Sequence, residues 1–254
     1  MATEYRNQQG GVVIGRDRAT VGVDEGLRQY MLKVYNWMAL GLVLTGAVAF
    51  AVISVEPIQQ LFFEYVRTSR GLAPKLTILG WVALFAPIAL VFFFSFRIER
   101  MSAATAQGTF WLYAALMGLS LAPIAAVYTG ESLAKAFFIS AATFGAMSLY
   151  GYTTKRNLTG LGNFLIMGLI GCLIAVVVNI FLQSAALGFA LSVLLVLIFV
   201  GLTAYDTQWI KNNYDASDDG EVMTKKSILG AFHLYLDFIN IFILILQLFG
   251  VRRD

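Results

Sequence analysis

The longest stretch of this chain without a charged residue runs from Asn157 to Tyr205. A helix crosses the core of a bilayer with about 20 apolar residues, so this stretch is long enough for two crossings. Further charge-free stretches cover 76–96, 101–130 and 136–154. Only 13% of all residues are charged, whereas soluble domains carry roughly 25%, so the charges are too few to coat a soluble globule. The sequence therefore predicts an all-α membrane protein.

Seven apolar segments are predicted to cross the membrane as helices. Residues 1–23 are polar and rich in glycine, and we expect a disordered cytoplasmic segment there, followed by a transmembrane domain over 24–254. Residues 24–35 fit either a short helix in the membrane interface or the first turns of the first span. The predicted spans are about 34–55, 75–97, 106–128, 133–152, 161–183, 187–209 and 227–250.

The third span contains small residues at every fourth position: Ala114, Gly118, Ala122 and Ala126. Small side chains at this spacing let the backbones of neighbouring helices approach closely. We therefore expect this helix to be buried in the bundle, with the stripe serving packing.

Positive charges predict the orientation of the chain. With the N-terminus in the cytoplasm, the inner segments hold 12 of the 18 Lys and Arg residues and the outer segments hold 6. Because Lys and Arg are enriched on the cytoplasmic side, we expect a cytoplasmic N-terminus and an external C-terminus. The basic residues lie at the ends of apolar runs, so the net charge of +3 does not indicate a nucleic-acid partner.

Three titratable residues lie within the predicted spans: Asp206, His233 and Asp237. A charge at the centre of a membrane costs about 2.5–3.5 kcal/mol on insertion scales, so such residues usually face a cavity, an ion path or a partner. Asp206 and Asp237 lie on consecutive antiparallel helices, which are usually neighbours. His233 and Asn240 lie four residues before and three after Asp237, on the same helix face.

Two neighbouring carboxylates resist ionising together, so they titrate as a pair. When ionised, such a pair suits a calcium ion, because calcium prefers oxygen ligands. Protonation would weaken ion binding and remove the repulsion, so one site would serve as ion station and pH sensor. The alternative that Asp206 and Asp237 only make hydrogen bonds between helices remains open.

The same residues occur in four strings that together resemble bacterial members of the Bax inhibitor family, also called the transmembrane Bax inhibitor motif family. The resemblance covers essentially the whole chain after about residue 24, and its most specific part is Tyr-Asp-Thr-Gln with the later Leu-Asp-Phe. The strings are Gly118-Leu-Ser-Leu-Ala-Pro-Ile124, Ser148-Leu-Tyr-Gly-Tyr-Thr-Thr-Lys-Arg156, Gly201-Leu-Thr-Ala-Tyr-Asp-Thr-Gln208 and Leu234-Tyr-Leu-Asp-Phe-Ile-Asn-Ile-Phe242.

The resemblance implies a seven-helix fold in which the last helix is central and surrounded by the other six. It also implies a pH-sensitive calcium leak in the inner membrane, with calcium as the transported ion and no cofactor. Asp206 and Asp237 match the paired aspartates of the family, as ion pathway, pH sensor and weak calcium site. A latch arginine matches Arg97 by position only, and Arg100 competes with it. We also consider three possible modulators: Tyr205, His233 and Asn240.

Two other functions are considered. Family members are associated with suppressing cell death or restraining membrane proteases, so the protein could be a non-conducting regulator that binds other membrane proteins. Intramembrane aspartyl proteases also use a Tyr-Asp pair, here Tyr205-Asp206. However, their second aspartate follows Gly-x-Gly, whereas Asp237 follows Leu234-Tyr235-Leu236, and their Pro-Ala-Leu string is absent. We therefore do not expect an enzyme.

The loop before the seventh span partly resembles a calcium-binding EF-hand loop. Asp215, Ser217, Asp219 and Gly220 match positions one, three, five and six of such a loop. Position twelve should be a bidentate glutamate, but it is Lys226. We therefore expect a solvated acidic loop there.

Overall fold

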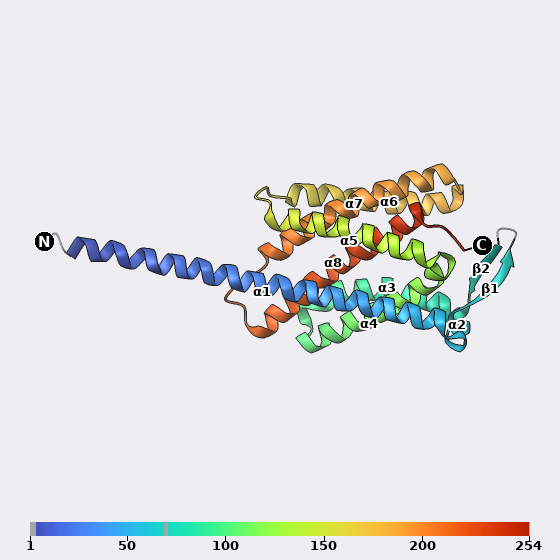
Figure 1. Cartoon of the computed structure of the whole chain (residues 1–254), viewed down its shortest axis with the longest axis horizontal. Coiled ribbons are helices and arrows are strands. Elements are labelled where there is room, and N and C mark those ends of the chain that lie inside the picture. The colour runs from blue at the N-terminus through green and yellow to red at the C-terminus, as the bar shows by residue number, and fades with distance from the viewer. Residues whose placement is uncertain (1–3, 69–70, 254) are drawn as a thin grey trace.

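This computed structural model describes the backbone of residues 4–68 and 71–253, and the side chains of 25–67, 75–94, 96–98 and 100–253. Within these residues the chain forms eight α-helices, one short 3-10 helix and one β-hairpin (Figure 1). The elements are α1 (Glu4–Ser54), α2 (Glu56–Phe62), β1 (Phe63–Thr68), β2 (Gly71–Leu76), α3 (Ile78–Arg97), η1 (Ile98–Arg100), α4 (Ala103–Val127), α5 (Gly130–Thr153), α6 (Thr159–Leu182), α7 (Ala185–Asn212) and α8 (Gly220–Phe249).

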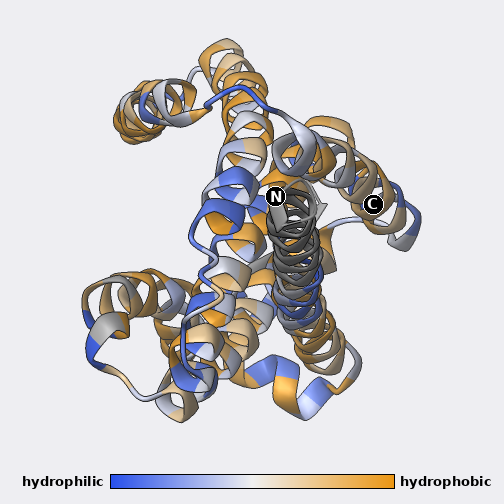
Figure 2. Cartoon of the chain, turned by 90° about the vertical axis from the view of Figure 1, so that its left-hand side faces the viewer, coloured by the Kyte–Doolittle hydropathy of each residue, from blue (hydrophilic) through white to orange (hydrophobic). Residues whose placement is uncertain are grey.

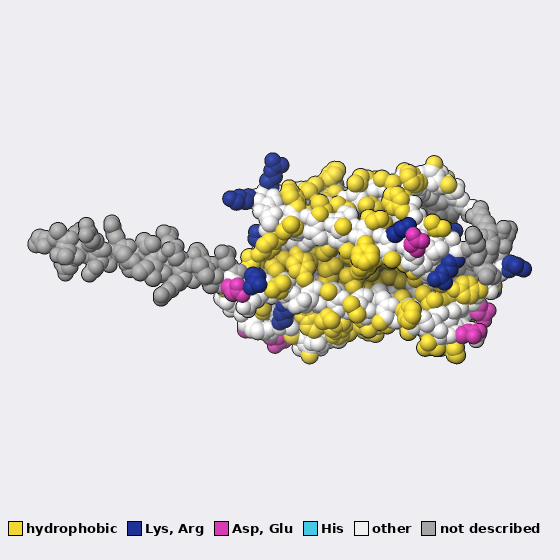
Figure 3. Space-filling view, viewed as in Figure 1, with side chains coloured by type: hydrophobic (Ala, Val, Ile, Leu, Met, Phe, Trp, Pro, Cys, Tyr) yellow, Lys and Arg dark blue, Asp and Glu magenta, His cyan; other side chains and the backbone are white. Residues whose placement is uncertain are grey.

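Six helices in the described part of the chain are long and apolar enough to cross a membrane: α1 from Glu25 onward, α4, α5, α6, α7 and α8. A shorter apolar stretch of α3 covers Ile78–Phe94. Hydrophobic residues make up most of these helices (Figure 2), and the charged side chains lie mainly toward the two ends of the bundle (Figure 3). The all-α membrane fold is therefore confirmed, whereas a count of seven crossings stays a prediction.

Residues 24–35 were predicted to form either an interfacial helix or the first turns of the first span, and the structure shows the second. These residues are the early turns of α1, which continues without a break to Ser54. Their apolar stripe is buried against the bundle at Tyr30, Met31 and Val34. The predicted disordered segment, 1–23, overlaps the first turns of α1, which begins at Glu4, and its side chains lie outside the description. Disorder of this segment stays a prediction.

The segment between the first two predicted spans contains the short helix α2 and a β-hairpin, which the sequence analysis did not predict. After α2, strands β1 and β2 pair antiparallel, with Phe63 opposite Leu76. The hairpin lies at the same end of the molecule as the C-terminus (Figure 1). Phe63 anchors it, because its side chain is fully buried in a cluster with Val52 and Ala122.

The last helix, α8, is the most buried of the long helices. The buried share of its most apolar window is 67%, against 6% for α6. It packs against α1, α4, α5 and α7, while α6 packs on α7. A central α8 that all six other spans surround therefore stays a prediction.

The small residues of α4 are buried, as the sequence predicted. A Cβ atom added to Gly118 would lie 2.6 Å from the backbone oxygen of Thr45 on α1. The two helix backbones can approach this closely only because Gly118 has no side chain. The stripe on α4 therefore serves packing.

Candidate functional site

The two intramembrane aspartates come together between α7 and α8. Asp206 lies near the end of α7, and Asp237 lies in the middle of α8. The connection between these helices is short, so they run antiparallel and pack against each other. Gly230 allows this approach, since an added Cβ there would lie 3.1 Å from the side chain of Ile210. The two carboxyl groups are close enough for their charges to interact.

The side chain of Asp237 is buried, and its hydrogen bonds are incomplete. Only 4% of the residue is exposed. Its Oδ2 is the one buried side-chain oxygen or nitrogen without a hydrogen-bond partner among the described residues. The side chain of Thr203, one turn before Asp206 on α7, lies within hydrogen-bonding reach of the Asp237 carboxyl. A buried carboxylate with a free oxygen is costly, so this atom requires an explanation.

Asp206 is less deeply buried than Asp237 and contacts a more exposed residue, His233. Its side chain is 15% exposed, and its Oδ2 lies 3.5 Å from Nδ1 of His233, whose side chain is 37% exposed. The His233 ring stacks on Trp209, with ring centres 5.2 Å apart. His233, Asp206 and Asp237 therefore form a row of titratable groups with increasing burial.

The other predicted site residues do not join this row. Arg97 and Arg100 are exposed at the ends of α3 and η1, and neither forms an ion pair among the residues that the structure describes. The Nδ2 of Asn240 donates to the carbonyl of Leu236 on its own helix, at 2.8 Å. A contact between a latch arginine and an aspartate thus stays a prediction. The side-chain amide of Asn240 bonds within its own helix, α8.

The four residues of the Tyr-Asp-Thr-Gln string contact four different parts of the molecule. Tyr205 packs on Gly162 of α6, where an added Cβ would overlap its ring. Asp206 pairs with His233 on α8. Thr207 bonds to Ser148 on α5. The sequence analysis did not predict a role for the last residue of the string, Gln208.

That residue, Gln208, fixes the loop between α5 and α6. Its Oε1 accepts from the backbone N–H of Leu158, and its Nε2 donates to the carbonyl of Arg156, both at 2.8 Å. Gln208 is only 8% exposed, so these bonds satisfy a buried amide. The string therefore joins α7 to α5, α6, α8 and the α5–α6 loop.

A chain of hydroxyl groups, also missed by sequence reasoning, joins three helices beside the aspartates. The Tyr35 hydroxyl on α1 lies 2.6 Å from Ser148 Oγ on α5, which lies 2.9 Å from Thr207 Oγ1 on α7. Thr207 donates its one hydroxyl proton to the carbonyl of Thr203, at 2.8 Å. It therefore accepts from Ser148, which in turn accepts from Tyr35. We call this arrangement the hydroxyl clasp. The spacing of four between Thr203 and Thr207 was the available sequence signal.

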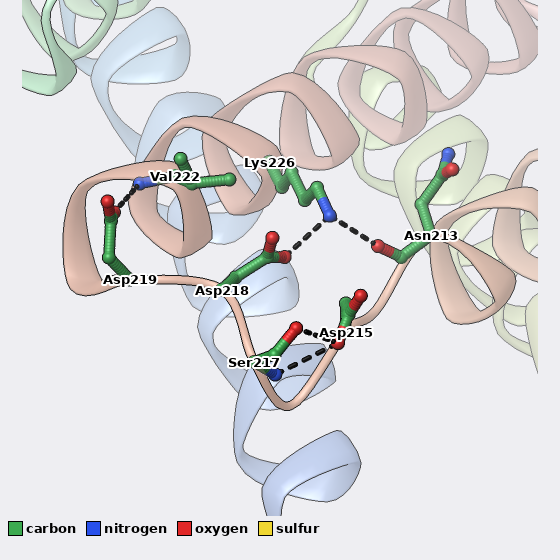
Figure 4. Close-up of polar contacts among 7 residues, drawn as sticks. All are labelled: Asn213, Asp215, Ser217, Asp218, Asp219, Val222 and Lys226. Atoms are coloured by element: carbon green, nitrogen blue, oxygen red, sulfur yellow. Dashed lines mark hydrogen bonds and ion pairs between the residues drawn. The ribbon is translucent and has the colours of Figure 1, made fainter.

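The acidic loop before α8 is organised around a lysine (Figure 4). Lys226 Nζ lies 2.5 Å from Asp218 Oδ2 and donates to the carbonyl of Asn213 at 3.0 Å. Asp215 accepts from the backbone and hydroxyl of Ser217, and these bonds hold the pKa of its carboxyl below the usual value. Asp219 caps α8. Lys226, the residue at position twelve, thus donates to Asp218 and Asn213, which are not among the matched EF-hand positions.

The chain is similar to known proteins over most of its length. A family model described as "Inhibitor of apoptosis-promoting Bax1" matches residues 27–254. An uncharacterized protein of Rickettsia prowazekii (strain Madrid E) is 50% identical over 231 residues, which cover 91% of this chain and 93% of the relative. The "Inner membrane protein YbhL" of Escherichia coli (strain K12) is 47% identical over 230 residues, covering 90% and 94%. An uncharacterized membrane protein of Streptococcus pyogenes serotype M3 is 34% identical over 231 residues, covering 91% and 96%.

Proposed function

The chain belongs to the Bax inhibitor family, and we propose that it is a pH-sensitive calcium leak of the inner membrane, gated by protonation of Asp206 and Asp237. Its N-terminus is cytoplasmic and its C-terminus external. It crosses the membrane seven times, with α3 as the shorter crossing and α8 at the centre. It is not an enzyme and needs no cofactor, since calcium is the ion that it carries.

One observation carries this proposal: Asp237 Oδ2 is buried without a partner next to a second carboxyl group. Such an atom fits a residue that alternates between two states, binding a cation when ionised and a proton when neutral. A residue that only joined two helices would be expected to satisfy both of its oxygens.

The surroundings of Asp237 support a role for its protonated form. Thr203 already donates its hydroxyl proton to the carbonyl of Phe199, at 2.8 Å. The Thr203 oxygen keeps lone pairs, so it can accept the proton of a neutral Asp237 carboxyl. In the ionised state the same two carboxylates repel each other and attract calcium, which prefers carboxylate oxygens.

His233 extends the site toward the solvent. When protonated, it pairs with Asp206 and competes there with a cation. His233 is therefore a modulator of the aspartate pair in this proposal.

The deciding experiment is calcium entry into proteoliposomes of the purified chain, followed with a trapped indicator across a pH series. We expect flux that changes with pH in the natural protein and loses this dependence in Asp206→Asn and Asp237→Asn. Glu131→Gln is the matched control, because Glu131 is an exposed carboxylate paired only with Lys135. Flux that is unchanged in both aspartate variants would refute the mechanism.

The same experiment separates the alternatives. If the folded protein gives no flux at any pH, the regulatory function takes its place, and capture of membrane proteases by the purified chain is then the next measurement. Cleavage of a helical substrate that is lost in Asp206→Asn and Asp237→Asn would instead indicate an intramembrane protease.

A further inference from the structure

A groove runs along the side of the bundle between α1 and α5. α1 packs against α4 and α8, and α5 packs against α7 and α8, so α8 forms the floor of the space between them. Figure 1 shows α8 passing behind this space, and hydrophobic side chains cover the same part of the surface in Figure 3. Two cavities lie there at successive levels along α1. We call the two together the lateral groove.

The cavity nearer the start of α1 has a volume of about 530 Å³ and both polar and apolar walls. Arg28, Leu32 and Tyr35 line it from α1, and Phe144 and Tyr152 line it from α5. Arg28 precedes the apolar part of α1, so this end of the groove lies at the level of lipid headgroups.

The second cavity, of about 350 Å³, is almost entirely apolar. Leu42 and Phe50 line it from α1, Phe137 from α5, and Phe238 from α8. At about 1.5 Å per helical residue, Leu42 lies roughly 15 Å further along α1 than Leu32, which is half of a hydrocarbon core of about 30 Å. An acyl chain of one leaflet that enters beside Leu32 therefore reaches the near end of the second cavity, at Leu42.

One cation, Arg28, lines the polar end, and a second, Lys211, contacts Tyr152 of its wall. Arg28 pairs with Glu25 at 3.1 Å, but both side chains are more than half exposed, so this ion pair is weak and can be exchanged. Lys211 donates to the carbonyl of Tyr152 at 2.7 Å and lies 5.1 Å from the centre of its ring. Arginine binds phosphate groups with two parallel hydrogen bonds. Arg28 thus suits an anionic headgroup.

We propose that the lateral groove binds one anionic phospholipid from the leaflet on the N-terminal side. Its phosphate lies beside Arg28, and one acyl chain runs past Phe144 toward Phe238 on the floor. The lipid thereby contacts the residue next to Asp237. Binding does not depend on calcium transport, so its failure and the failure of the leak are separate results.

The test is native mass spectrometry of the full chain in detergent, titrated with phosphatidylglycerol or phosphatidylcholine. Gly145→Leu fills the first cavity, and Gly46→Leu fills the second. Gly171→Leu on α6 is the matched control, because an added Cβ meets nothing within 4 Å at any of these three glycines. We expect tight binding of one phosphatidylglycerol, weakened about tenfold by either groove variant and unchanged in the control.

The headgroup is tested by Arg28→Gln, which we expect to reduce the preference for phosphatidylglycerol over phosphatidylcholine about fivefold. Equal binding of the two lipids by the natural protein would overturn the proposal. So would groove variants that bind lipid as the Gly171→Leu control does. A dimer signal that Gly145→Leu abolishes, without a change in lipid adducts, would show that a helix of a second copy occupies the groove instead.

Discussion

The hydroxyl clasp bonds to the backbone of Thr203, whose side chain lies within reach of the buried Asp237. It connects Tyr35, Ser148 and Thr207 across three helices, and Thr207 then bonds to the backbone of Thr203. Ser148 is the central member and is only 4% exposed. Removal of its hydroxyl would leave Tyr35 without an acceptor and Thr207 without a donor. The clasp therefore holds α1, α5 and α7 together near Asp237.

We expect Ser148→Ala to destabilise the folded protein by about 1–2 kcal/mol, because it leaves polar groups unpaired in a buried place. Thermal unfolding in detergent measures this change. Thr153→Val on the same helix is the control, since Thr153 is exposed and its hydroxyl bonds to the carbonyls of Leu149 and Tyr150 on its own helix. Equal melting temperatures for the two variants would show that the clasp contributes nothing to stability.

Asp215 gives a pH prediction outside the membrane. The backbone N–H of Ser217 and then its hydroxyl lower the pKa of this carboxyl. Its contribution to stability is therefore present above the ordinary value of about 3.9 and is lost as the pH falls through the lowered value. Ser217→Ala removes the hydroxyl but keeps the N–H, so the pKa of Asp215 should rise part of the way. A carbon-detected NMR titration measures it, and an unchanged pKa would contradict this assignment.

Sequence reasoning located the aspartate pair for a physical reason that acts on single residues. A carboxyl group in an apolar span is costly wherever it lies, so Asp206 and Asp237 are conspicuous without coordinates. The hydroxyl clasp is different, because Ser148 and Thr207 are ordinary residues in membrane helices. Their importance depends on which helices are neighbours, and the sequence does not state this.

At the scale of helices, glycines set how closely α5 approaches its neighbours. A Cβ on Gly151 would overlap the carbonyl of Ala204 on α7, whereas a Cβ on Gly145 would meet nothing within 4 Å. The two glycines lie on one helix but differ in what they face. Gly151 is therefore required by the contact with α7, and Gly145 is not.

We expect Gly151→Ala to destabilise the protein by about 1–3 kcal/mol, because α5 and α7 must separate. Gly145→Ala should be neutral or stabilising by about 0.5–1 kcal/mol, because alanine restricts the unfolded chain. Denaturant or thermal unfolding of both variants measures the difference. If the two variants were equally stable, the close contact at Gly151 would not be required.

The helices themselves were predictable because each needs a long apolar segment. The predicted spans agree with α1 and α3–α8 to within a few residues at most ends. Two starts differ most: α1 begins well before residue 34, and α8 begins at Gly220, in a polar segment where Asp219 caps the helix. The hairpin β1–β2 contains no long apolar segment that would predict it. It is formed by two six-residue strands and anchored by one buried side chain, Phe63.

At the scale of the whole molecule, the ends of the bundle have distinct structures. The C-terminal residues pair with the α4–α5 connection: Tyr128 and Arg252 form an isolated β-bridge, and Arg253 N–H donates to the carbonyl of Val127. The hairpin lies at this end, and the loop between α7 and α8 lies at the other (Figure 1). The two loops must therefore face opposite sides of the membrane.

The positive charges predict that the α7–α8 loop is cytoplasmic. Single cysteines can test this in a Cys172→Ser background, since Cys172 is the only cysteine. Glu64 on the hairpin and Ser217 in the loop are both exposed. An impermeant maleimide should label Glu64→Cys in intact spheroplasts, and Ser217→Cys only after the membrane is opened. The reverse pattern would invert the orientation. Labelling of both sites in intact spheroplasts would contradict the placement of the two loops on opposite sides, because helices of fixed length separate them.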